Sequence, residues 1–143
     1  MAQARIGTSG WMYQHWRGLF YEPGLRTGAW LERYAEHFDT VEINSSFYRL
    51  PPRKTFVSWA ERTPAGFRFA VKGSRFLTHL KRLTEPEEHV ELFFERVAGL
   101  GRKTGPILWQ LPPNFHRNDE RLAAFLEVLP QKHRHAIEFR HES

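Results

Sequence analysis

The 143-residue sequence contains no cysteine. Disulfide bonds, zinc sites with thiolate ligands and thiol catalysis are therefore excluded. No apolar run approaches the ~20 residues that a membrane-spanning helix needs. The N-terminus, MAQARIGTSGW, also lacks the apolar core of a signal peptide. We therefore expect a cytoplasmic protein without a membrane partner.

Basic side chains outnumber acidic ones, with 21 Lys and Arg against 16 Asp and Glu. The net charge of +5 permits an anionic partner, such as a phosphorylated metabolite or a nucleic acid. It does not require one, because the basic residues are scattered along the chain. A hydrophobic content of 41%, with 12 Phe and 5 Trp, is enough for one packed core. We predict a single domain over residues 1–143.

The stretch 40–52, TVEINSSFYRLPP, organises the rest of the chain. Val41 and Ile43 alternate with Glu42 and Asn44, which is the pattern of a strand with one apolar and one polar face. Three more apolar runs of strand length turn polar at their ends: FRFAVKG with Ala70 and Lys72, PILWQLP with Leu108 and Gln110, and HAIEFRH with Glu138 and Arg140. Repeated polar strand ends favour a parallel sheet with a site at its carboxyl edge.

Helical periodicity separates these runs, and a further strand is predicted at 6–11. Helices are expected at 27–38, 53–62, from Thr84 to Leu100 and from Asn118 to Leu129. Thr84 and Glu87 have capping-box spacing, and Asn118 can cap the last helix. The residues expected to be buried in the last two helices are Val90, Phe93, Val97, Leu100, Leu122, Phe125, Leu126 and Leu129. Strands that start at roughly 30-residue intervals are typical of parallel βαβ units, so we predict an α/β fold.

Five segments resemble, in order, the YecE-like family (domain of unknown function 72, DUF72): IGTSGW, VEINSSFYRLP, FRFAVKG with THLKRL, GPILWQLPPNF and HAIEFRHES. The resemblance implies a TIM-barrel-type (β/α) fold. Family members continue beyond the last segment, and a complete barrel needs ~250 residues. The resemblance therefore implies an incomplete barrel, truncated after the fifth parallel strand of eight.

Glu42, Lys72 and Glu138 are the candidate catalytic residues. They lie near the ends of three predicted strands, which meet at one edge of a parallel sheet. A lysine desolvated between carboxylates can have its pKa tuned for proton transfer or imine formation. The alternative is a buried ion network that holds the strands in register.

Asn44, Gln110 and Arg140 are candidates for orienting a substrate. Amides donate and accept hydrogen bonds, and a guanidinium can bind a carboxylate or phosphate at two points. Alternatively, the three side chains only satisfy the hydrogen bonds of the catalytic charges.

His79 and His141 each follow a predicted strand by a few residues. Either could bind substrate, act as a general acid or base, or ligate a metal together with Glu42 and Glu138. Because the sequence has neither H-x-x-x-H nor H-E-x-x-H spacing, no metal site is predicted. The alternative is a loop histidine bonded to the backbone.

Aromatic side chains in the first two loops could stack on a sugar or a nucleobase, or could form a hydrophobic lid: Trp11, Tyr13, Trp16, Phe47 and Tyr48. Basic residues after the FRFAVKG strand could bind phosphate or be solvated: Arg75, Lys81 and Arg82. Glycine motifs for nucleotide binding are absent from the sequence.

The leading hypothesis is an enzyme of acid/base or hydrolase type that acts on a small polar or anionic, phosphorylated or sugar-like substrate. The sequence does not identify a cofactor. One alternative is a protein that binds or processes nucleic acid, and another is an inactive truncated barrel. Because an unclosed sheet leaves its edge strands unpaired, we expect self-association or dependence on a missing C-terminal half.

Overall fold

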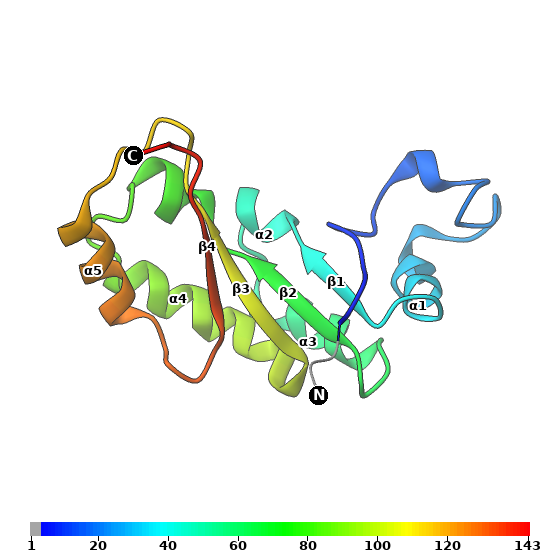
Figure 1. Ribbon diagram of the computed structural model, residues 1–143. Coiled ribbons are helices and arrows are strands. Elements are labelled where there is room, and N and C mark those ends of the chain that lie inside the picture. The colour runs from blue at the N-terminus through cyan, green and yellow to red at the C-terminus, as the bar shows by residue number, and fades with distance from the viewer. Residues whose placement is uncertain (1–3) are drawn as a thin grey trace.

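A four-stranded parallel sheet is the centre of the computed structural model, which describes residues 4–143. The strands are β1 (Thr40–Ile43), β2 (Arg68–Lys72), β3 (Thr104–Gln110) and β4 (His135–Glu138). Their order across the sheet is their order along the chain, and all three pairs are parallel (Figure 1). The predicted α/β architecture with parallel strands is confirmed.

Helices alternate with the strands and leave one face of the sheet open. They are α1 (Trp30–Ala35), α2 (Ser45–Tyr48), α3 (Arg53–Glu61), α4 (Glu87–Val97), α5 (Asp119–Val128) and a π-helix, η3 (Phe76–Leu80). Figure 1 shows α3 and α4 behind the sheet, and no helix of residues 4–143 covers its front. Within the same residues, none of the helices is long and apolar enough to cross a membrane.

Strand alternation explains which face is buried. The side chains that face the helices are Val41, Ile43, Phe69, Val71, Ile107 and Trp109, each no more than 1% exposed. Their neighbours along the strands, among them Glu42, Ala70, Lys72 and Leu108, are only half-buried on the opposite face. The apolar stripe predicted between Thr84 and Leu100 is confirmed, since Val90, Phe93 and Val97 of α4 and Leu100 of the following 3-10 helix, η4 (Ala98–Lys103), are all buried.

The segment 6–11 is not a strand, so the prediction of a fifth strand there is wrong. It meets β1 through a single parallel bridge between Ser9 and Glu42. The amide of Glu42 donates to the Thr8 carbonyl at 3.0 Å, and the amide of Gly10 donates to the Glu42 carbonyl at 2.9 Å. Gly10 has a φ of +91°. This left-handed backbone, open to glycine, turns the chain away before a ladder can form.

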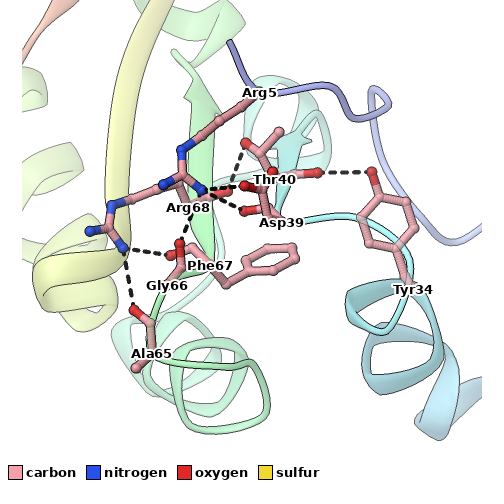
Figure 2. Close-up of polar contacts among 8 residues, drawn as sticks. All are labelled: Arg5, Tyr34, Asp39, Thr40, Ala65, Gly66, Phe67 and Arg68. Atoms are coloured by element: carbon pink, nitrogen blue, oxygen red, sulfur yellow. Dashed lines mark hydrogen bonds and ion pairs between the residues drawn. The ribbon is translucent and has the colours of Figure 1, made fainter. Parts of the chain in front are cut away.

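A set of polar contacts fixes the N-terminal segment to the starts of β1 and β2 (Figure 2). The guanidinium of Arg5 donates to the Asp39 carboxylate at 2.7 Å and to the Gly66 carbonyl at 3.1 Å. The hydroxyl of Tyr34 donates to the Thr40 carbonyl at 2.9 Å. The edge of β1 is therefore covered by a chain that is anchored mainly through side chains.

Helix ends and faces agree with the sequence in part. The Asn118 side chain caps α5 by accepting from the Arg121 amide at 2.9 Å, as predicted. The prediction of a capping box at Thr84 is wrong. The Thr84 hydroxyl donates to the Lys81 carbonyl at 2.6 Å, and α4 begins only at Glu87. Leu126, predicted to be buried, is 41% exposed.

Candidate functional site at the carboxyl edge of the sheet

The register of the strands decides which predicted residues can meet. Gln110 on β3 lies beside Glu138 on β4, and Lys72 on β2 lies beside Leu108 on β3. Leu108 is two residues before Gln110, so Lys72, Gln110 and Glu138 step diagonally across the open face. They reach the edge where parallel strands end, as the polar strand ends predicted.

Glu138 is held as a carboxylate by two neighbours. The Gln110 side chain donates to one carboxylate oxygen at 3.1 Å, and Arg140 Nε donates to the other at 2.6 Å. These two hydrogen bonds, followed by the charges of Arg140 and Lys72, hold the pKa of Glu138 below its ordinary value despite its partial burial. Glu138 is therefore ionised near neutral pH.

The ammonium group of Lys72 is held by an aromatic ring. Its Nζ lies 4.5 Å from the centre of the Phe47 ring, which is a cation–π distance. Lys72 forms no ion pair within residues 4–143. Ser46 ties α2 to this strand end, because its buried hydroxyl oxygen lies 2.6 Å from the Lys72 carbonyl. A charged amine without a carboxylate partner is available to an anionic group.

His79 projects from the π-helix towards the same ring. Its imidazole meets the Phe47 ring edge to face at 5.0 Å, and its Nδ1 lies 2.8 Å from the Thr78 hydroxyl. Burial, followed by the charges of Arg75, Arg140, Lys72 and Arg82, lowers the pKa of His79 from its ordinary value of 6.5. The imidazole is therefore neutral at pH 7.

Glu42 does not join this group. It is paired in register with Ala70, two residues before Lys72, and its carboxylate accepts from the Ser9 hydroxyl at 2.8 Å. Glu42 borders a cavity of about 920 Å³ on the open face, towards the amino ends of the strands, whose other lining residues include Arg5 and Arg68. Of the three predicted catalytic residues, the structure thus brings together Lys72 and Glu138.

Four predicted contact residues share a second, mostly apolar pocket of about 240 Å³, which is linked to Phe47 through the ring of Tyr48 at 5.0 Å. Trp11, Tyr13, Asn44 and Tyr48 line it. Trp11 is 6% exposed and packs edge-on against Trp59 at 5.2 Å, so it is mainly a core residue. Within residues 4–143, the buried side-chain oxygen of Asn44 has no hydrogen-bond partner.

His141 lies in another place. Its ring packs on the His116 ring at 4.0 Å, and its Nδ1 lies 2.9 Å from the Ser143 hydroxyl. Both histidines border a cavity of about 370 Å³ at the start of α5. No group of three or more His, Asp or Glu side chains in residues 4–143 could hold a metal ion.

Arg75 and Arg82 belong to the candidate site more closely than the sequence indicated. Their charges act on His79, although they lie in the loop rather than on a strand. Arg82 is fixed by donating to the Asn114 carbonyl at 2.8 Å and lies 5.1 Å from the Phe115 ring centre. No sequence signal pairs 82 with 114–115, because the contact joins two separate loops. We define the carboxyl-edge site by the residues Phe47, Lys72, Arg75, His79, Arg82, Gln110, Glu138 and Arg140.

A family model described as "Protein of unknown function DUF72" matches residues 5–143. Among curated proteins, the UPF0759 protein YecE of Escherichia coli K12 is 33% identical over 137 residues, which cover 95% of this chain and 48% of that protein. The UPF0759 protein YunF of Bacillus subtilis 168 is 30% identical, over 82% of this chain and 43% of YunF. The chain spans about half the length of these curated relatives.

Solved structures show the same fold. A DUF72 family protein from Thermotoga maritima superposes with a TM-score of 0.79 at 28% identity, over 93% of this chain and 55% of that chain. A DUF72 family protein from Enterococcus faecalis superposes with a TM-score of 0.73 at 24% identity, over 94% of this chain and 50% of that chain. At that identity, the second likeness shows the fold alone.

Proposed function

The chain belongs to the DUF72 family, and we propose that its carboxyl-edge site performs acid/base chemistry on a small polar substrate. One observation carries the proposal. An ionised carboxylate, a neutral imidazole and an ammonium group without a carboxylate partner come together at Glu138, His79 and Lys72. Groups whose environments push their protonation states apart are typical of acid/base sites.

In this proposal His79 is the base. The Thr78 hydroxyl lies 3.4 Å from the Ser74 carbonyl, to which it donates. The oxygen of Thr78 is then free to accept a hydrogen bond from a protonated His79 Nδ1, which leaves the lone pair on Nε2. A neutral imidazole with one fixed nitrogen can take a proton from a bound hydroxyl or carbon acid, and such a base contributes about 10²- to 10⁴-fold to a rate.

Lys72 and Glu138 have complementary roles. The ammonium group of Lys72 stabilises negative charge that develops on the substrate as the proton leaves. Glu138 accepts a hydrogen bond from a substrate hydroxyl and holds Arg140 towards the site through the 2.6 Å contact. Gln110, which is 8% exposed, orients that carboxylate from the neighbouring strand. The remaining predicted contact residues, Asn44, Trp11, Tyr13 and Tyr48, would hold the apolar part of the substrate in the adjacent pocket.

We also propose that the sheet is part of a TIM-type (β/α) barrel. Support comes from the parallel order β1-β2-β3-β4, the helices on one face and the open opposite face. In such a barrel the open face would be the interior, and the carboxyl ends of the strands would form the catalytic mouth. The location of Lys72 and Glu138 agrees with that arrangement.

Nucleic-acid binding has less support from the basic loop. Lys81 is paired with the Glu85 carboxylate at 2.9 Å, so one of the three predicted phosphate contacts in this loop is already neutralised. The other alternative, an inactive chain, would be the conclusion if no substrate were found by the experiment below.

A panel of small polar compounds, including sugars, hydroxy acids and their phosphorylated forms, tests the proposal. Binding is measured by ligand-observed NMR and turnover by mass spectrometry. We expect Glu138→Gln and His79→Gln to bind the active compound but to lose turnover. Arg102→Gln, which removes an exposed charge far from the site, should keep both. Turnover that survives in both site variants would refute the assignment.

A further inference from the structure

We propose that the carboxyl-edge site contains a phosphate subsite, in which Lys72, Arg82 and Arg140 bind the dianionic phosphate of a small phosphorylated ligand. This inference names the substrate class of the site and so rests on the proposed function. It does not depend on turnover, because phosphate binding can be measured by itself.

The first argument is an excess of positive charge around one point. Lys72, Arg75, Arg82 and Arg140 all lie close enough to His79 to act on it by charge. Within residues 4–143, the one carboxylate that joins them through a direct contact is Glu138, which binds Arg140. Four cations gathered around a neutral imidazole repel one another, and a bound dianion would relieve that repulsion.

The second argument is the way in which the cations are held. Lys72 rests on the Phe47 ring, and Arg82 rests on the Phe115 ring and is bound to Asn114. An aromatic face holds a cation without neutralising it. Both side chains are therefore positioned while their charge remains available, which lowers the entropy cost of binding an anion.

The third argument is backbone strain in the loop that carries Arg82. Arg82, Leu83 and Glu85 have φ values of 51°, 64° and 45°, in the left-handed region that non-glycine residues rarely adopt. The preceding element, which carries His79, is a π-helix. Both features are found preferentially at functional sites, where the surrounding structure holds them in place. Here Leu83 is 1% exposed and anchors the loop in the core.

A small phosphate fits this arrangement better than a polynucleotide. The cations come from three separate parts of the chain, namely β2, the loop after the π-helix and the segment after β4, and each acts by charge on the one residue His79. An extended nucleic acid is typically bound by a track of basic groups and by stacked aromatic rings. A guanidinium pair and an ammonium at one point match the three oxygens of a terminal phosphate.

Inorganic phosphate is the probe, and the ring resonances of His79 report its binding. Phosphate should raise the pKa of His79, because the dianion neutralises the cations that oppose its protonation. Lys72→Gln, Arg82→Gln and Arg140→Gln should each weaken binding about tenfold or more, since each removes a charge-assisted contact. Arg102→Gln, the matched loss of one exposed positive charge, should leave the affinity unchanged. Unaltered His79 resonances up to about 20 mM phosphate would overturn the subsite.

Two further measurements separate this inference from its alternatives. Glu138→Gln should bind phosphate as well as the parent or better, because a negative charge is lost while the amide oxygen can still accept from Arg140 Nε. If that holds while no turnover is ever found, the subsite stands and the proposed function fails. Single-stranded oligonucleotides of increasing length are compared with a mononucleotide. Affinity that rises steadily with length, and falls steeply with salt, would replace the small ligand by a nucleic acid and so refute the inference.

Discussion

The ammonium group of Lys72 lies 4.5 Å from the centre of the Phe47 ring. The ring of His79 meets the same phenyl group edge to face, with 5.0 Å between the two ring centres. Phe47 is 8% exposed and belongs to the short helix α2, directly after the end of β1. One side chain from the first strand–helix loop therefore positions two polar groups that come from β2 and the π-helix.

Replacing Phe47 with Leu tests this role. We expect the free energy of unfolding to fall by about 1–2 kcal/mol, because the cation–π contact and the aromatic edge contact are both lost. Urea denaturation measures the change. Phe76→Leu is the matched control, since Phe76 is 42% exposed and packs on His89 outside the site. An equal loss in both variants would show that Phe47 is an ordinary apolar residue.

Arg140→Gln should shift two pKa values in the same direction. The pKa of Glu138 should rise, because the variant loses a hydrogen bond and a positive charge that stabilise the carboxylate. The pKa of His79 should also rise, because a charge that opposes its protonation is gone. NMR titration follows both groups in one sample. If only Glu138 responded, Arg140 and His79 would not share a site.

Stability should fall in mildly acidic solution. The folded-state pKa values of His79 and His133 lie below the ordinary 6.5, mainly through burial, so the unfolded state takes up protons first as the pH falls. The contribution of each histidine is complete above about pH 6.5 and is lost as the pH falls through its folded-state pKa. Urea midpoints measured from neutral to acidic pH should decrease. His79→Gln and His133→Gln should each make that decrease shallower, and an unchanged slope in both would contradict the assignment.

Gly73→Ala should be strongly destabilising. A Cβ at this position would clash with the Trp109 ring, and the neighbouring backbone is fixed by a 2.7 Å bond from the Gly73 amide to the Leu108 carbonyl. Overpacking of this kind costs about 1–3 kcal/mol or more. Gly66→Ala is the control, because nothing lies within 4 Å of the position that its Cβ would take. Thermal melts compare the two. Since Gly73 follows Lys72, the variant should also lose phosphate binding.

Self-association is the expected behaviour of this chain in isolation. The open face presents Leu108 and Ala70, and Phe139 at the end of β4 is 62% exposed. Exposed apolar area of this kind favours association. Sedimentation at micromolar concentration should show dimers or larger species, and Phe139→Ser should shift them towards monomers. Leu19→Ser, at a residue that is 86% exposed in the N-terminal loop, is the control. A monodisperse monomer of the parent chain would refute this prediction.

The sequence predicts the four strands of the sheet, although not the absence of a fifth, because the signals involved are local. Val41 and Ile43 alternate with polar neighbours, and that period alone places them on the helix side. Parallel strands end at the same edge of a sheet for geometric reasons, and Lys72 and Glu138 are the last residues of β2 and β4. Asn118 needs only its own helix to act as a cap.

The rest of the site depends on contacts that no local pattern contains. Glu42 has the residue type and face of a catalytic group, but the Ser9 hydroxyl reaches it from a distant segment. Thr84 has the spacing of a capping box with Glu87, yet its hydroxyl donates to the Lys81 carbonyl instead. The π-helix at 76–80 has no recognised sequence signature, although it is what turns His79 towards Phe47.

The matching orders of strands in the sheet and along the chain have a consequence for biosynthesis. When β2 leaves the ribosome, β1 is already available to pair with it, and β3 and β4 each find the preceding strand in the same way. No strand has to wait for a later one, so the sheet can grow in one direction during translation. The first polar group of the site to be placed would be Lys72, and Glu138 and Arg140 would complete it last.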